Sequence, residues 1–139
     1  MTPLALTWSE VDMAVRAFVS LYREAPLTMR AEAIYGEPRG GLIPAVMLSH
    51  YLQIPLVKER PTSGVYIWVD DIVDSGETVE IAVATEKCIA FRWALCQKPR
   101  SRVHISHGIF VDNDKWVIFP WEDPAQAEQD FLNYHAKHL

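Results

Sequence analysis

The most constraining feature of the sequence is the stretch from Val65 to Val79, VYIWVDDIVDSGETV. Its first five residues are apolar and mostly β-branched or aromatic, which is typical of a strand buried on both faces. Asp70 and Asp71 follow directly and would lie at the carboxyl end of that strand. In an open parallel sheet this edge is where ligands bind, so the stretch predicts a ligand site.

The residue types in this stretch suit a phosphorylated sugar. Adjacent carboxylates on a rigid strand can accept the two hydroxyls of a ribose, or hold a hard cation such as Mg²⁺. The turn Asp74-Ser75-Gly76-Glu77-Thr78 then leads into a helix, whose free N–H groups and positive dipole end favour a phosphate. An isolated Asp-Asp dipeptide would indicate a solvated acidic turn, but here the strand, the acids and the turn occur together.

A second candidate phosphate cradle lies nearer the N-terminus. A predicted strand, Ala31 to Gly36, is followed by Arg39-Gly40-Gly41 and then by a helical pattern from Leu42 to Leu52. Paired glycines let backbone N–H groups approach an anion closely, and an arginine adds charged donors. A tight strand-to-helix turn would explain this tripeptide equally well on its own. Beside the first cradle, it gives one site for a pyrophosphate and one for a 5′-phosphate.

The other segments complete an alternation of strands and helices. They are a helix to Arg23 opened by a capping box of Thr7 and Glu10, a strand at Ile54–Val57, a helix at Val79–Lys87, a strand at Phe91–Cys96, a hairpin or edge strand within Phe110–Glu122, and a last helix capped by Asp123. This order predicts a single α/β domain over residues 1–139, with a mostly parallel central sheet flanked by helices.

Two more positions suit a planar heterocycle. Lys98 ends the strand at Phe91–Cys96 and is fixed by Pro99, so it could donate to an exocyclic oxygen such as O6 of a purine, although an isolated lysine is more often a surface charge. Trp116 follows a polar turn and could stack on a base, while the backbone near Val117 reads the edge of that base. Packing in the core is the alternative for this tryptophan.

These motifs resemble those of the type I phosphoribosyltransferases, in which apolar residues precede Asp-Asp-x-x-Asp-Ser/Thr-Gly-x-Thr. The succession Lys98-Pro99, Trp116-Val117 and Pro120-Trp121-Glu122 is similar to the purine-recognition half of bacterial xanthine-guanine phosphoribosyltransferases. The resemblance covers nearly the whole chain. It implies the type I fold and a Mg²⁺-dependent purine salvage reaction. In that reaction, 5-phosphoribosyl pyrophosphate (PRPP) and guanine, xanthine or hypoxanthine give a nucleoside monophosphate and pyrophosphate.

The resemblance also implies roles for individual residues. Asp74 would be the general base at purine N7, and Asp70 and Asp71 would hold Mg²⁺ on the ribose side. A cis peptide is implied between Pro38 and Arg39. The implied PRPP-binding residues are Arg39, Gly40, Gly41, Asp70, Asp71, Ser75, Gly76, Glu77 and Thr78, and the implied purine-binding residues are Lys98, Trp116 and Val117.

The chain departs from the family pattern at Lys58 to Gly64. Purine members carry a long mobile hood here, with a Ser-Tyr pair that helps to exclude water, whereas this connection is KERPTSG. Lys58 and Arg60 could reach a pyrophosphate, although turn charges are more often solvated. Two alternatives follow: a PRPP- or nucleotide-binding regulatory or sensor module with little turnover, or an enzyme whose hood comes from a neighbouring subunit. Asp74 and Lys98 favour an enzyme, because a phosphate binder needs neither.

Composition and charge limit the kinds of partner and the cellular location that we expect for the protein. The net charge is −5 and there is no Lys/Arg run, which argues against general nucleic-acid binding. Met1 to Thr7 lacks the basic start of a signal peptide, and no apolar run is long enough to span a bilayer. Cys88 and Cys96 have no metal-ligand spacing and fit reduced thiols. We expect a cytoplasmic protein, and the resemblance implies a homodimer or homotetramer.

Overall fold

The computed structural model describes residues 1–85 and 88–137, and its centre is a five-stranded sheet. Along the sheet the strands are β3 (Leu56–Val57), β2 (Ala33–Gly36), β4 (Val65–Val73), β5 (Ile89–Gln97) and β6 (Ser106–Phe110). Every neighbouring pair in this sheet is parallel. The predicted α/β fold with a mostly parallel sheet is confirmed.

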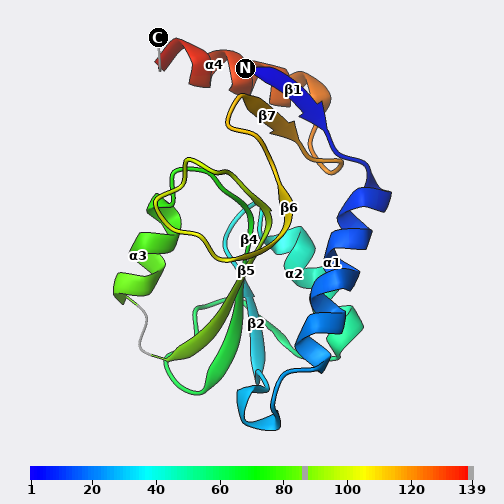
Figure 1. Cartoon of the computed structure of the whole chain (residues 1–139), viewed down its shortest axis with the longest axis vertical. Coiled ribbons are helices and arrows are strands. Elements are labelled where there is room, and N and C mark those ends of the chain that lie inside the picture. Colours follow the sequence, from blue (N-terminus) through cyan, green and yellow to red (C-terminus); the bar gives the residue numbers. More distant parts are fainter. Residues whose placement is uncertain (86–87, 138–139) are drawn as a thin grey trace.

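Helices cover both faces of the sheet (Figure 1). Helices α1 (Trp8–Arg23) and α2 (Leu42–Leu52) lie on one face and α3 (Glu77–Thr85) lies on the other. Side chains of β4 pack on both faces of the sheet, because successive side chains of a strand point to opposite sides. Ile67 belongs to the core cluster that contains residues of α1 and α2, and Trp68 to the cluster that contains residues of α3. The predicted burial of this strand on both faces is therefore confirmed.

A second, two-stranded sheet lies at one end of the molecule (Figure 1). It pairs β1 (Thr2–Ala5) in parallel with β7 (Lys115–Ile118), and α4 (Pro124–Lys137) lies beside it. The predicted hairpin within Phe110–Glu122 is therefore wrong, whereas the alternative of an edge strand holds for β7, which is one of the two strands of this small sheet. The reason is a turn at residues 112–115, closed by the Lys115 N–H donating to the Asp112 carbonyl at 3.1 Å, which takes the chain out of the central sheet.

The predicted end of α1 at Arg23 and both ends of α2 are confirmed, whereas the start of α3 and several strand ends move. The Thr7 hydroxyl accepts from the Glu10 N–H at 3.1 Å and the Glu10 carboxylate accepts from the Thr7 N–H at 3.0 Å, which completes the capping box of α1. The Asp123 carboxylate accepts from the Ala125 N–H at 3.0 Å at the start of α4. Strand β4 runs on to Val73 and β2 begins only at Ala33. Helix α3 starts at Glu77, and its predicted end at Lys87 lies outside the described residues.

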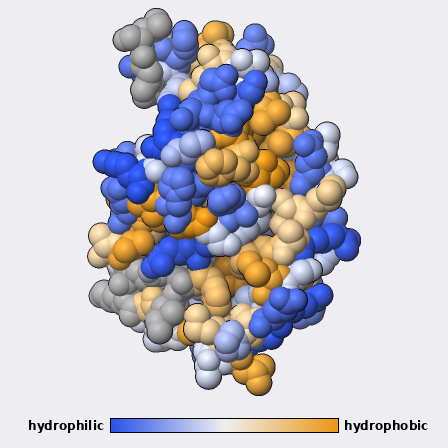
Figure 2. Space-filling model, in the orientation of Figure 1, coloured by the Kyte–Doolittle hydropathy of each residue, from blue (hydrophilic) through white to orange (hydrophobic). Residues whose placement is uncertain are grey.

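The surface mixes hydrophilic and hydrophobic side chains, as the face in Figure 2 illustrates. Exposed large hydrophobic residues include Met13, Leu21 and Phe110. Within the described ranges, none of the helices combines the length and the apolar character that crossing a membrane requires.

Candidate active site

Three loops meet at the carboxyl edge of the central sheet. They follow β2, β4 and β5, which are neighbours in the sheet order, so their ends lie side by side. The loop after β2 contains Arg39, the turn after β4 contains Asp74, and the loop after β5 contains Lys98. The topology therefore brings the two predicted phosphate cradles and the predicted purine-binding lysine to one place.

The pleat of β4 directs its two adjacent carboxylates into different cavities. Asp70 lines a small cavity of about 80 Å³ together with the turn after β4. Asp71 lines a cavity of about 540 Å³ together with Arg39 and Gly40. Because Asp70 and Asp71 are consecutive residues of β4, a ligand that touches both carboxylates would lie across the carboxyl end of this strand.

Asp70 is only 8% exposed, and burial raises its pKa to about 9, with the charge of Asp71 adding to the effect. The backbone N–H of Asp71 donates to its carboxylate at 2.8 Å. Keeping this buried carboxylate ionised without a nearby cation costs free energy. The pair therefore fits a cation or a set of hydroxyl donors that would compensate the charge.

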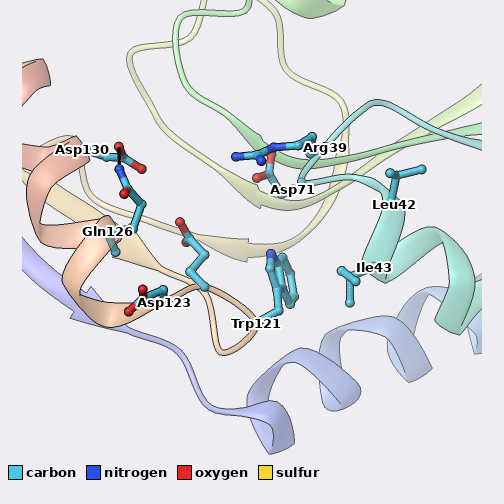
Figure 3. Close-up of a pocket in the computed structure, with 11 residues that line it drawn as sticks. Arg39, Leu42, Ile43, Asp71, Trp121, Asp123, Gln126 and Asp130 are labelled. Carbon is cyan, nitrogen blue, oxygen red and sulfur yellow. Dashed lines mark hydrogen bonds between the residues drawn. The ribbon is translucent and has the colours of Figure 1, made fainter.

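The loop after β2 lies against Asp71. A Cβ atom built on Gly40 would be 1.8 Å from the Asp71 Oδ2 atom, so only glycine allows this approach. The peptide bond between Pro38 and Arg39 is cis, as the family resemblance implies. The side chains of Arg39 and Asp71 lie next to each other at the large cavity, which Trp121 and Gln126 line from the opposite side (Figure 3). A guanidinium beside backbone N–H groups makes this loop suitable for a pyrophosphate.

The turn after β4 forms the small cavity with its own backbone. Gly76 has a φ of 89°, a left-handed conformation that favours glycine. The Ser75 hydroxyl accepts from the Glu77 N–H at 3.2 Å, and α3 begins directly afterwards. Asp70, Gly76, Glu77 and Thr78 all line the cavity. Free N–H groups at a helix start beside this cavity suit a phosphate group.

A third cavity, of about 190 Å³, contains the predicted purine-binding residues. It is lined by Asp71, Ile72, Asp74, Lys98, Trp116, Val117, Phe119 and Glu122. The Trp116 ring lies 5.7 Å from the Phe131 ring and 5.1 Å from the Tyr134 ring, both of α4. Trp116 is thus supported from α4 while it also lines the cavity.

Lys98 is a buried lysine with identifiable partners. Its side chain is 2% exposed, and Nζ donates to the Lys115 carbonyl at 2.6 Å and lies 3.5 Å from the Asn113 carbonyl. The Asp74 Oδ1 atom is 4.0 Å away. Burial lowers the pKa of Lys98, and the carboxylate of Asp74 partly offsets this effect. The alternative of a surface charge is therefore wrong for this residue.

Arg100 and Glu122 line or contact the site without having been assigned a role from the sequence. Arg100 binds Asp74, with Nε 2.6 Å and Nη2 2.5 Å from Oδ1. Glu122 lines both larger cavities, and burial raises its pKa. No pattern within one segment signals the contact of Arg100 with Asp74, because it joins two loops that are 26 residues apart in the sequence.

The short connection at residues 58–64 is tied to the loop after β2. Arg60 Nη2 lies 3.2 Å from the Glu37 carboxylate, and Nη1 donates to the Thr85 hydroxyl at 2.7 Å. The guanidinium also lies over the Tyr35 ring, with its central carbon 5.7 Å from the ring centroid. Arg60 is therefore no solvated turn charge. It links the connection to the residue that precedes the cis peptide.

No protein-family model matches the chain. A curated relative, the xanthine-guanine phosphoribosyltransferase of Cereibacter sphaeroides, is 30% identical over 153 aligned residues that cover 91% of this chain and 90% of the relative. The chain belongs to the xanthine-guanine phosphoribosyltransferase family. The enzyme of the same name from Nitratidesulfovibrio vulgaris is 26% identical, and the alignment covers 92% of this chain and 90% of that enzyme.

A solved structure agrees with this phosphoribosyltransferase assignment. The crystal structure of a purine phosphoribosyltransferase from Pyrococcus horikoshii is 31% identical, with a TM-score of 0.72, over 88% of this chain and 96% of that one. The type I phosphoribosyltransferase fold is confirmed, and the protein is a pentosyltransferase enzyme. The alternative of a regulatory or sensor module is not favoured, because these similar proteins carry the names of transferases.

Proposed function

We propose that this phosphoribosyltransferase moves the 5-phosphoribosyl group of PRPP to N9 of a 6-oxopurine, in purine salvage. The products are a nucleoside monophosphate and pyrophosphate. The observation that carries the proposal is the junction of three cavities at the end of β4, where the carboxylates of Asp70 and Asp71 join the two cradles to the cavity of Lys98 and Trp116. PRPP carries a 5′-phosphate and a 1-pyrophosphate on one ribose, which matches two cradles on either side of two carboxylates.

PRPP would lie across the end of the sheet. The pyrophosphate would bind at the loop of Arg39, Gly40 and Gly41, which the cavity of about 540 Å³ adjoins. The 5′-phosphate would bind at the turn of Ser75, Gly76, Glu77 and Thr78, mainly through backbone N–H groups. The exposed Glu77 carboxylate would point away from it.

The ribose hydroxyls would then face the carboxylates of Asp70 and Asp71. The same two residues fit Mg²⁺, which commonly takes one or two carboxylates together with substrate phosphates. The raised pKa of the buried Asp70 supports this fit, because a cation would compensate its charge. When bound, Mg²⁺ supplies positive charge that stabilises the leaving pyrophosphate.

The purine would occupy the cavity of about 190 Å³. Trp116 would stack on the ring and the backbone at Val117 would bind its edge. Lys98 has its ammonium at the cavity and would donate to O6. These contacts orient N9 toward C1′ of PRPP, and orientation of this kind can supply a large part of the rate enhancement.

Asp74 would be the general base. In the reaction the bond from N9 to C1′ forms, the bond from C1′ to the pyrophosphate oxygen breaks with its electron pair leaving on pyrophosphate, and the N7 proton moves to Asp74. Asp74 lines the same cavity as Lys98 and Trp116, which puts a carboxylate beside the bound purine.

Product formation tests this proposal. The purified protein is incubated with PRPP, Mg²⁺ and one of guanine, xanthine, hypoxanthine or adenine, and nucleotides are separated by chromatography. A monophosphate of at least one 6-oxopurine is expected, with adenine as the matched base that lacks O6. Asp74→Asn should reduce product formation by about 10²- to 10⁴-fold and leave PRPP binding intact. Absence of product with every 6-oxopurine would refute the proposed transfer.

A further inference from the structure

Asp74 is held by a neighbouring arginine from another loop. Arg100 Nε and Nη2 lie 2.6 Å and 2.5 Å from Asp74 Oδ1, and Lys98 Nζ lies 4.0 Å from the same oxygen. The contacts of the Asp74 carboxylate found among the described residues all use Oδ1. The second oxygen, Oδ2, is therefore the one that can accept a proton in the cavity.

Arg100 is itself fixed by two further elements. Its Nη2 donates to the Tyr134 hydroxyl of α4 at 2.8 Å, and its backbone N–H donates to the Asn113 side-chain oxygen at 2.9 Å. The Arg102 N–H in the same loop donates to the Ser75 carbonyl at 3.1 Å, which joins this loop to the turn of Asp74. Charge-assisted hydrogen bonds with a defined fork geometry restrict both partners more than a single contact does.

Tyr134 also contacts the residue expected to stack on the purine. Its ring centroid is 5.1 Å from that of Trp116. One residue of α4 therefore supports the stacking ring with its own ring, and supports the arginine with its hydroxyl. Helix α4 connects the two sides of the purine cavity through this residue.

We propose that Arg100, held by Tyr134, is a positioning residue that fixes Asp74 through Oδ1, so that Oδ2 is presented to the proton on purine N7. The inference rests on the proposed transfer to a 6-oxopurine. Asp74 is about one third exposed and lies in the turn after β4, so without a partner its carboxylate would sample several rotamers. Small displacements of a catalytic group lower the rate of the chemical step much more than they lower substrate binding.

The test compares kcat and KM in four variants under the assay above. Arg100→Gln should lower kcat by about 10- to 100-fold, while KM for PRPP and for guanine stays near that of the wild type. Arg100→Lys should restore part of kcat. Tyr134→Phe keeps the ring beside Trp116 and should lower kcat less than Arg100→Gln does. Arg102→Gln is the matched control from the same loop, because Arg102 is exposed and pairs with Glu80 on α3, and its kcat should not change.

A double variant separates positioning of Asp74 from any other role of Arg100. In an Asp74→Asn background, Arg100→Gln should cause no further loss of kcat, because its effect passes through Asp74. A further loss, or an unchanged kcat in Arg100→Gln alone with an active wild type, would overturn this inference and leave the proposed function standing. If the wild type forms no nucleotide, both fail. Thermal denaturation of each variant distinguishes loss of folding from loss of turnover.

Discussion

Replacing Lys98 with methionine removes a buried ammonium from the purine cavity while keeping an unbranched side chain of similar length. In the wild type the Lys98 Nζ atom is held by the Lys115 carbonyl at 2.6 Å, with the Asn113 carbonyl at 3.5 Å and the Asp74 carboxylate at 4.0 Å. An ammonium in this position has a donor left for an exocyclic oxygen. The substitution should therefore weaken the binding of 6-oxopurines selectively.

The magnitude follows from the kind of hydrogen bond that is lost. A hydrogen bond to a charged group contributes about 1.5–3 kcal/mol, which corresponds to a rise of about 10- to 150-fold in KM for guanine. In the proposed binding mode PRPP contacts the two phosphate loops and not Lys98, so its Kd should not change. Leaving the Lys115 carbonyl without its donor costs about 1–3 kcal/mol of folding stability, which a thermal denaturation curve records separately.

The assay varies guanine at saturating PRPP, varies PRPP at saturating guanine, and measures PRPP binding by calorimetry. Lys137→Met is the matched control, because Lys137 is exposed at the end of α4. 2-Aminopurine, which is guanine without its 6-oxygen, provides a second control on the substrate side. Lys98→Met should affect its KM little.

Two results would refute this reasoning. An equal loss for guanine and 2-aminopurine would mean that Lys98 does not act through O6. An equal loss for guanine and PRPP would mean that the variant disturbs the whole sheet edge, and that Lys98 holds Asn113, Lys115 and Asp74 together without binding the purine.

Three further perturbations test other parts of the site. Burial lowers the pKa of Lys98, and only the protonated form has the positive charge and a third donor for O6. KM for guanine should therefore rise as the pH increases through that lowered pKa, relative to Lys98→Met, in which ionisation of the base itself is the same; parallel pH profiles would contradict this. Gly40→Ala brings a Cβ to 1.8 Å from Asp71 Oδ2 and should lower PRPP affinity by about tenfold or more in calorimetry, whereas unchanged affinity would exclude a role for this approach. Arg60→Gln releases Glu37 beside the pyrophosphate loop and should raise KM for PRPP about fivefold, roughly 1 kcal/mol, without changing KM for guanine; a matching rise for guanine would argue against a local effect.

The fold could be predicted from the sequence where local patterns and burial agree. The apolar run at Val65–Val69 and the capping box of Thr7 specified β4 and α1, because a doubly buried strand and a capped amphipathic helix each have a distinctive pattern. Strand β1 was not predicted, because Thr2–Ala5 is largely exposed and its pairing with β7 is a contact between distant segments. This pairing, together with the turn at residues 112–115, is the reason why the predicted hairpin is wrong.

The site was predicted less completely than the fold. The motif of Asp70, Asp71 and Asp74 identifies the edge of the sheet, but the pleat that sends the first two carboxylates into different cavities emerges only from the folded chain. Arg100 is brought to Asp74 by two loops that adjoin in space and by Tyr134, 34 residues further along. A pattern within one segment carries no information on such a contact.

The short connection at residues 58–64 could not be interpreted from its length alone. Its charges suggested either a contact with pyrophosphate or exposure to solvent, whereas Arg60 binds Glu37 and Thr85. The loop after β2 is thereby braced by the segment that forms a hood in other purine members.

The most direct test of the account is a ³¹P NMR time course of PRPP consumption with Mg²⁺ and guanine, in which every phosphorus-containing product is observed. Phosphoribosyl transfer should give one pyrophosphate for each PRPP consumed, most of it matched by guanosine monophosphate and the small remainder by ribose 5-phosphate. The nucleotide signal should be lost in Asp74→Asn. Ribose 5-phosphate as the main product would mean that water replaces the purine. PRPP that persists beside guanine, with no new signal, would contradict the claim that this site performs phosphoribosyl transfer.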